Sequence, residues 1–235
     1  MNPIKSLKNL SLFEWGLWIF SLIVVFASGA LTPNQSPLML INSLIGVTAL
    51  IFVAKADVLG QLLTVVFSLL YAVISFSFSY YGEMITYLGM TMPIALMSVI
   101  SWLRHPFSKD GVEVKVNKIA KNEWLLMLFA ATAVTVAFYF ILRLFNTSNL
   151  IFSTISITTS FAASYLSFRR SPFYALAYSA NDVVLIILWV LASLENSVYV
   201  PVVVCFSMFF INDVYGFINW NRIKKRQNSL SMEEF

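Results

Sequence analysis

Eight long apolar runs dominate this sequence and leave few folds open to it. A helix needs about 20 apolar residues to cross the hydrocarbon core of a bilayer, and each run is close to that length. The chain is 59% hydrophobic and only 11% charged, whereas an ordinary soluble domain has about 25% charged residues. The sequence therefore predicts an all-α membrane protein with eight transmembrane helices at 14–31, 37–54, 58–80, 84–103, 123–143, 149–168, 173–194 and 198–219.

The basic residues predict how these helices are oriented. Cytoplasmic segments of membrane proteins carry an excess of Lys and Arg. With both termini in the cytoplasm, only Arg143 of the 15 basic residues falls on the outer side. We therefore expect a multi-pass protein of the cytoplasmic (inner) membrane, contacting lipid and no nucleic acid. The cytoplasmic set is Lys5, Lys8, Lys55, Arg104, Lys109, Lys115, Lys118, Lys121, Arg169, Arg170, Arg222, Lys224, Lys225 and Arg226.

The first apolar run has a second interpretation. Lys5 and Lys8, the apolar stretch after them and the small residues "ASGA" resemble a secretory signal peptide. No soluble exported domain follows, so a membrane helix is the preferred interpretation. Whether this segment crosses the whole bilayer stays open.

Residue types needed for catalysis or metal binding are scarce. Cys205 and His105 are the single cysteine and histidine, so one chain cannot build a Cys or His metal cluster. The phosphate-binding pattern G-x-x-x-x-G-K-[ST] does not occur. We expect no cofactor, no metal and no enzymatic activity. The alternatives are a membrane-embedded enzyme, such as a lipid hydrolase, and a non-transporting scaffold subunit.

The two halves of the chain resemble each other. A shift of 118 positions places Trp102 on Trp220 and Arg104 on Arg222, and it superposes the three-run blocks without a gap. Both blocks begin outside and end inside, as parallel repeats of transporters do. The expected units are an extra N-terminal helix (1–36), a three-helix bundle (37–104), a loop with a linking helix (105–148), a second three-helix bundle (149–222) and a cytoplasmic tail (223–235), whose polar end "NSLSMEEF" (228–235) is expected to be disordered.

Polar side chains inside the apolar runs are the candidate site. The pairs Asn181–Asp182 and Asn212–Asp213 lie within the last two runs, and an ionised carboxylate in lipid is costly enough that it faces protein or water. Helical spacing places aromatic or polar neighbours on the same faces, and amides beside rings suit a flat heteroaromatic ligand. The predicted substrate-binding residues are Asn181, Asp182, Trp189, Tyr178, Asn212, Tyr215, Gln61, Thr64 and Tyr71.

The three-one-three arrangement, the "ND" of the seventh run and the ending "INDVYGFINWNRIKKRQ" (211–227) resemble the PnuC family of bacterial vitamin transporters. The resemblance implies a SWEET-like pair of three-helix bundles, a possible homotrimer, and uptake of nicotinamide riboside by facilitated diffusion. Other members of the family carry thiamine, riboflavin or deoxynucleosides. The first block ends "PIALMSVISWLRHP", without the Asn-x-Tyr-Gly-Trp type of ending found in nicotinamide riboside members, so these substrates stay open.

Overall fold

A computed structural model describes residues 3–77, 81–108, 111–147 and 149–233, and regular structure in these ranges is helical. The α-helices are joined by short turns, by a π-helical turn at Tyr87–Thr91 and by a 3₁₀ turn at Ser197–Tyr199. Their bounds are α1 Pro3–Lys8, α2 Leu12–Ala30, α3 Pro37–Ala54, α4 Val58–Ser77, α5 Tyr81–Thr86, α6 Met92–Arg104, α7 Lys121–Leu144, α8 Leu150–Phe168, α9 Phe173–Glu195 and α10 Val200–Glu233.

Eight helices of the described chain are long and apolar enough to cross a membrane, and they coincide with the eight predicted runs. The fourth is Tyr81–Arg104, composed of α5, the π turn and α6. The prediction of an all-α membrane protein is therefore confirmed.

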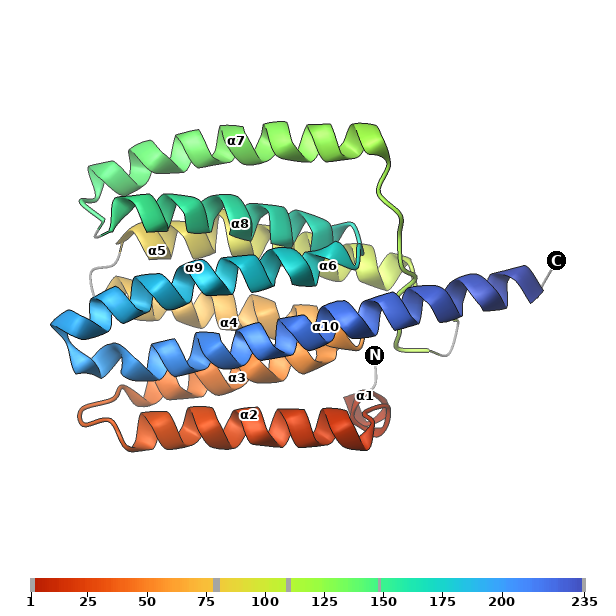
Figure 1. The fold of residues 1–235 in the computed structure, drawn as a ribbon, viewed down its shortest axis with the longest axis horizontal. Helices are drawn as coiled ribbons and strands as arrows, with labels where there is room; N and C mark the ends of the chain where they lie inside the picture. Colours follow the sequence, from red (N-terminus) through yellow and green to blue (C-terminus); the bar gives the residue numbers. More distant parts are fainter. Residues whose placement is uncertain (1–2, 78–80, 109–110, 148, 234–235) are drawn as a thin grey trace.

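The long helices lie roughly side by side, with α7 along one edge and α2 along the other (Figure 1). Helix α3 packs against α2, α4 and α10, whereas α8 packs against α6, α7 and α9. Large apolar side chains on α7 face outward, and Leu125 and Phe129 are 69% and 74% exposed. Such a surface is suited to lipid, because lipid removes the cost of exposing it to water.

The fourth span is interrupted where it passes the centre of the molecule. The backbone N–H of Met92 bonds to the carbonyl of Tyr87, five residues earlier. Pro93 follows directly, and a proline has no N–H to continue the ordinary ladder. One wider π turn accommodates this break, and it changes which side chains of the span face inward.

Two tight corners reveal the internal repeat. Ala56, between α3 and α4, and Arg170, between α8 and α9, both have left-handed backbone angles, with φ of 56° and 57°. The hydrogen bonds around the two corners match pairwise at a shift of 114 positions. At the first corner, the bonds run from Lys55 N to Ile51 O, from Ala56 N to Val53 O, from Asp57 N to Phe52 O and from Leu59 N to Asp57 Oδ1. At the second corner, the corresponding bonds run from Arg169 N to Tyr165 O, from Arg170 N to Ser167 O, from Ser171 N to Leu166 O and from Phe173 N to Ser171 Oγ.

The ungapped shift of 118 positions is correct only for the third helix of each block. Trp102 of α6 donates its indole N–H to the carbonyl of Ser167, at 2.9 Å, and Trp220 of α10 donates to the carbonyl of Val53, at 2.8 Å. Ser167 lies 114 positions after Val53, whereas the two tryptophans are 118 apart. The four extra positions of the second block therefore lie between its corner and its tryptophan, within 171–220.

The two tryptophans therefore form a reciprocal contact between the blocks. Each comes from one block and bonds to a corner of the other, both are completely buried, and their ring centroids are 5.4 Å apart. We call this end of the molecule the Trp end.

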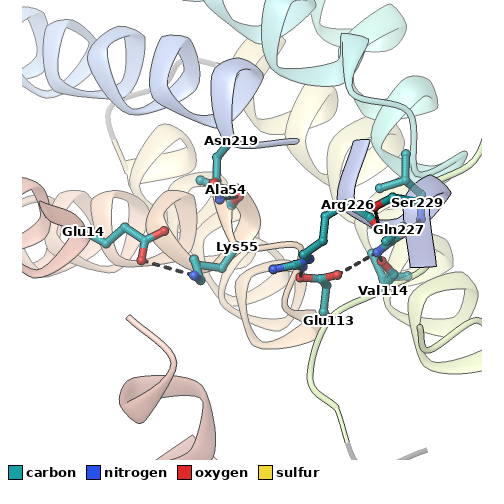
Figure 2. A network of polar contacts seen from close by, with 10 residues as sticks. Glu14, Ala54, Lys55, Glu113, Val114, Asn219, Arg226, Gln227 and Ser229 are labelled. Atoms are coloured by element: carbon teal, nitrogen blue, oxygen red, sulfur yellow. Dashed lines mark hydrogen bonds and ion pairs between the residues drawn. The ribbon is translucent and has the colours of Figure 1, made fainter. Parts of the chain in front are cut away.

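The segment between α6 and α7, residues 105–120, packs across the Trp end. The N–H of Val114 bonds to the carbonyl of Ala56, and the N–H of Asn117 bonds to that of Arg170, so the segment contacts both corners. Gln227 of α10 donates to the Glu113 side chain and to the Val114 carbonyl, and Arg226 pairs with Glu113 (Figure 2).

The polar end of the tail, 228–235, was predicted to be disordered, and this prediction is wrong for residues 228–233. Helix α10 continues without a break to Glu233, and it extends beyond the rest of the bundle (Figure 1). Gln227 is buried beneath the 105–120 segment, which anchors the helix beyond the last apolar turn. Residues 234–235 lie outside the described residues, as do Lys109 of the basic set and Ser148.

Candidate functional site

A cavity of about 80 Å³ lies among helices from both blocks, in the middle of the molecule. We call it the central cavity. Space of this size holds several water molecules, since one water needs about 10–15 Å³ by this measure. Its lining includes Gly46, Ala49, Leu50 and Val53 of α3, Gln61, Thr64 and Phe67 of α4, Tyr87 and Thr91 of the π turn, Ser160 of α8, Tyr174, Tyr178, Asn181, Asp182 and Leu185 of α9, and Phe206, Phe209 and Asp213 of α10.

Two buried polar atoms of the lining have no hydrogen-bond partner among the described residues. They are Oδ2 of Asp182 and the hydroxyl of Tyr174, on side chains that are only 3% and 1% exposed. Leaving such a group unpaired costs about 1–3 kcal/mol, and native proteins rarely do so without a ligand or an ordered water. The cavity is therefore unlike an ordinary protein core, and its unpaired groups can form hydrogen bonds to a polar ligand.

Other polar groups of the lining are held in place by neighbours. Oδ1 of Asn181 accepts a hydrogen bond of 2.8 Å from the Thr159 hydroxyl, which leaves the amide nitrogen to donate elsewhere. Gln61 Nε2 donates to the Ser167 hydroxyl at 2.9 Å. The side chains of Asp182 and Asp213 both line the cavity and are close enough to interact, and two carboxyl groups in such a position can share one proton.

Aromatic rings form the rest of the wall. The ring centroid of Phe209 lies 5.8 Å from that of Phe67 and 5.4 Å from that of Phe206. The ring of Phe209 reaches α3 because position 46 is glycine: a Cβ there would lie 2.4 Å from its Cζ atom. The site thus combines flat apolar surfaces with a carboxyl pair and an amide.

The structure brings five of the nine predicted site residues into this cavity: Tyr178, Asn181, Asp182, Gln61 and Thr64. Trp189 and Tyr71 line an adjoining pocket instead.

Asn212 and Tyr215 do not line the central cavity. Asn212 donates to the Ser21 hydroxyl at 3.0 Å, and the Tyr215 hydroxyl donates to Glu14 at 2.6 Å. Both partners belong to α2, which covers this face of α10. Asp213 follows Asn212 on α10, so its side chain is rotated by about 100° around the helix axis from that of Asn212. Asp213 therefore lines the central cavity, whereas Asn212 and Tyr215 do not.

Several lining residues were not among the predicted ones. Tyr174 could have been found, because it precedes Tyr178 by four residues and so shares its helix face. Asp213 was noticed as an intramembrane carboxylate but was not placed in the site. Tyr87 and Thr91 face the cavity across the π turn, and nothing in their spacing indicates that turn.

Metal binding has no support in the described ranges, where no three His, Cys, Asp or Glu side chains come together. The lining of the central cavity also includes no Lys, Arg or His. Its charge therefore comes from Asp182 and Asp213.

Comparison with known proteins gives consistent results. The chain is 24% identical, over 216 residues, to the nicotinamide riboside transporter PnuC of Neisseria mucosa, which covers 90% of this chain and 82% of that protein. It is 21% identical to the PnuC protein of Haemophilus influenzae, over 90% of this chain and 91% of that one. The crystal structure of the vitamin B3 transporter PnuC superposes with a TM-score of 0.81, at 24% identity, over 95% and 97% of the two chains.

A family model described as the nicotinamide mononucleotide transporter matches residues 36–222. That range contains the spans from α3 to the apolar part of α10 and leaves only α1 and α2 before it. This chain is therefore a multi-pass membrane protein that belongs to the nicotinamide mononucleotide transporter family, a family of transporters and not of enzymes.

Proposed function

We propose that this protein carries nicotinamide riboside across the bacterial inner membrane and binds it in the central cavity. The proposal is supported by the relatives in Neisseria mucosa and Haemophilus influenzae, which are named nicotinamide riboside transporters. The observation that carries it is the unpaired Oδ2 atom of Asp182 among aromatic rings.

The chemistry of the ligand fits this lining. Nicotinamide riboside has a flat, positively charged pyridinium ring, a carboxamide and ribose hydroxyls. Phe and Tyr rings attract a flat cation through their π faces. The Asp182–Asp213 pair holds one negative charge when it shares one proton, which balances a single positive charge in a low-dielectric site. The Asn181 amide nitrogen can donate to a hydroxyl or to the carboxamide oxygen.

The same lining argues against the mononucleotide as cargo. A phosphate group requires Arg, Lys or a cluster of backbone N–H donors. The central cavity has no basic side chain among its lining residues, and its two carboxyl groups would repel a phosphate. We therefore favour the riboside over the nucleotide that gives the family its name.

The charge distribution supports a cytoplasmic position for the Trp end and for both termini. Lys55, Arg104, Arg169, Arg170 and Arg222 all lie at or beside this end, as the positive-inside rule requires of a cytoplasmic face. Arg143 lies at the opposite end of α7.

Facilitated diffusion and a homotrimer complete the proposal. Facilitated diffusion requires a site that binds its ligand weakly enough to release it on both sides of the membrane. A carboxyl pair and aromatic rings meet this requirement, because they do not form a dense cluster of charged contacts to the ligand. The support for a trimer is the resemblance to the PnuC family, with lipid covering the remaining exposed apolar faces.

The experiment is a thermal-shift measurement on the purified protein in detergent. Its ligands are nicotinamide riboside, nicotinamide mononucleotide, thiamine, riboflavin and thymidine. A ligand at 100 times its Kd stabilises the folded state by about 2.7 kcal/mol. We expect this shift with the riboside, and a much smaller one in the double variant Asp182→Asn/Asp213→Asn, which keeps the shape but removes both carboxyl groups that can hold the charge. A shift with another ligand alone, or with the mononucleotide, would overturn the proposed substrate.

A further inference from the structure

A second pocket, of about 30 Å³, adjoins the central cavity on the side away from the Trp end. We call it the Glu83 pocket. Its polar and aromatic lining includes Asn42 of α3, Tyr71 of α4, Glu83 of α5 and Trp189 of α9. Phe67 and Phe206 line both this pocket and the central cavity, so these two rings are the partition between them.

The Glu83 pocket places a polar side chain without a partner beside a carboxylate. Asn42 is 2% exposed, and its Oδ1 atom accepts no hydrogen bond from the described residues. Glu83 lines the same pocket, and it takes part in none of the salt bridges of the described chain. A buried amide oxygen and a carboxylate facing one small space are a costly arrangement for a structural core.

Glu83 lies where three spaces meet. Besides its own pocket, it lines a cavity of about 90 Å³ that extends to Tyr199, just beyond the end of α9. It also lines a small space of about 20 Å³ that reaches Asn181 of the central cavity. Glu83 is thus the residue shared by three neighbouring spaces, which together extend from the end of α9 to a lining residue of the central cavity.

Aromatic rings line the same spaces as this carboxylate. The ring centroid of Trp189 lies 5.5 Å from that of Tyr199, and the ring centroid of Tyr71 lies 4.2 Å from that of Tyr87. Among the described residues that line the three spaces there is no Lys or Arg. A carboxylate without a basic neighbour, in spaces lined by Trp and Tyr, is the chemistry that recognises an organic cation, because both attract positive charge.

We propose that the Glu83 pocket is a capture site, which binds a planar organic cation before it passes Phe67 and Phe206 into the central cavity. Glu83 selects for the positive charge, and Asn42 offers a hydrogen-bond acceptor to the ligand's donors. The site rests on the proposed function for the identity of its cargo, but its preference for a cation follows from its own lining.

The test measures initial uptake by the full-length protein in proteoliposomes. Two ligands of nearly the same shape are compared: nicotinamide riboside, whose ring is cationic, and its reduced dihydro form, whose ring is neutral. In Glu83→Gln we expect KM for the cation to rise at least 5-fold, kcat to stay within 2-fold, and KM for the neutral form to stay unchanged.

The control is Glu123→Gln. It removes the same charge at the start of α7, where Glu123 pairs with Arg169 and lines none of the three spaces. We expect KM for either ligand to change less than 2-fold. If Glu83→Gln does not fold, Glu83→Asp keeps the charge but withdraws it by one methylene, and the ratio of the two KM values should then shift in the same direction.

The outcomes separate this inference from the proposed function. A wild-type protein that takes up no nicotinamide riboside would overturn the proposed function, whatever the variants do. A wild-type protein that takes it up, with Glu83→Gln changing KM for both ligands equally or for neither, would overturn the capture site alone.

Discussion

The Trp end and the central cavity are built from corresponding parts of the two blocks, but in opposite ways. At the Trp end, the two corners share their backbone angles and hydrogen bonds, and two tryptophans bond reciprocally across the blocks. In the central cavity, the corresponding positions have different residues. At the shifts that match the blocks, these pairs are Gly60 and Tyr174, Gln61 and Ala175, Thr64 and Tyr178, Phe67 and Asn181, Ala95 and Asp213.

This difference indicates which positions hold the fold and which bind the ligand. A contact that holds two equivalent bundles together can be made twice with the same residues. A single asymmetric ligand needs different groups on its two sides, so the binding positions have to differ. Here the aspartates are on the second block, and the first supplies Phe67 and Gln61. Substitutions at the Trp end should therefore affect stability, and substitutions in the cavity should affect binding.

The largest expected effect is on the Trp end. Trp220→Ala removes a fully buried ring and its hydrogen bond to Val53, so we expect the free energy of unfolding to fall by about 3–5 kcal/mol. Thermal unfolding in detergent measures this loss. Trp124→Ala, at a partly exposed ring, is the control, and equal losses in the two variants would contradict the structural role of the reciprocal pair.

The next largest effect concerns the close approach of α3 and α4. A Cβ at position 60 would lie 2.3 Å from the backbone nitrogen of Val53, and backbone cannot move aside as a side chain can. We expect Gly60→Ala to cost about 1–3 kcal/mol of stability. The matched variant Gly16→Ala meets nothing within 4 Å, so it should leave the unfolding temperature unchanged or raise it, because Ala favours helix over Gly.

A pair of asparagines distinguishes binding from packing. Asn181→Ala removes an amide from the cavity, and we expect the Kd for nicotinamide riboside to rise about 10-fold, equivalent to about 1.4 kcal/mol. Asn212→Ala removes a contact to Ser21 of α2, so it should lower the unfolding temperature and change Kd less than 2-fold. Titration calorimetry gives both constants. A large rise in Kd for Asn212→Ala, with little change for Asn181→Ala, would instead place the binding site at the interface of α2 and α10.

The smallest effect is a pH dependence at a corner. Burial raises the pKa of Asp57, although the hydrogen bond from the backbone N–H of Leu59 and the charge of Lys55 act to lower it. Because the folded protein then holds this proton more tightly than the unfolded chain, the residue contributes more stability as the pH falls from 7 toward about 4. We expect the wild-type protein to gain stability over Asp57→Asn across this range. Thermal unfolding of both proteins at several pH values measures this gain. A stability difference between the wild-type protein and Asp57→Asn that does not change with pH would contradict the raised pKa of Asp57.

The sequence predicted the spans well because length and hydropathy largely determine them in a membrane. It predicted Tyr178, Asn181 and Asp182 as site residues because polar groups in apolar runs need a protein partner, and all three line the central cavity. It could not show that α2 covers Asn212 and Tyr215, since that depends on how distant helices pack. The π turn at Tyr87–Thr91 and the bonds that hold Gln227 also depend on contacts that spacing does not reveal.

The most direct test is a structure of the protein with nicotinamide riboside bound. The account predicts the ligand between α4, α9 and α10, with its cationic ring near Asp182 and a polar group within hydrogen-bonding distance of the Asn181 amide. A ligand bound beside Asn212 and Tyr215, against α2, would contradict the central cavity as the binding site.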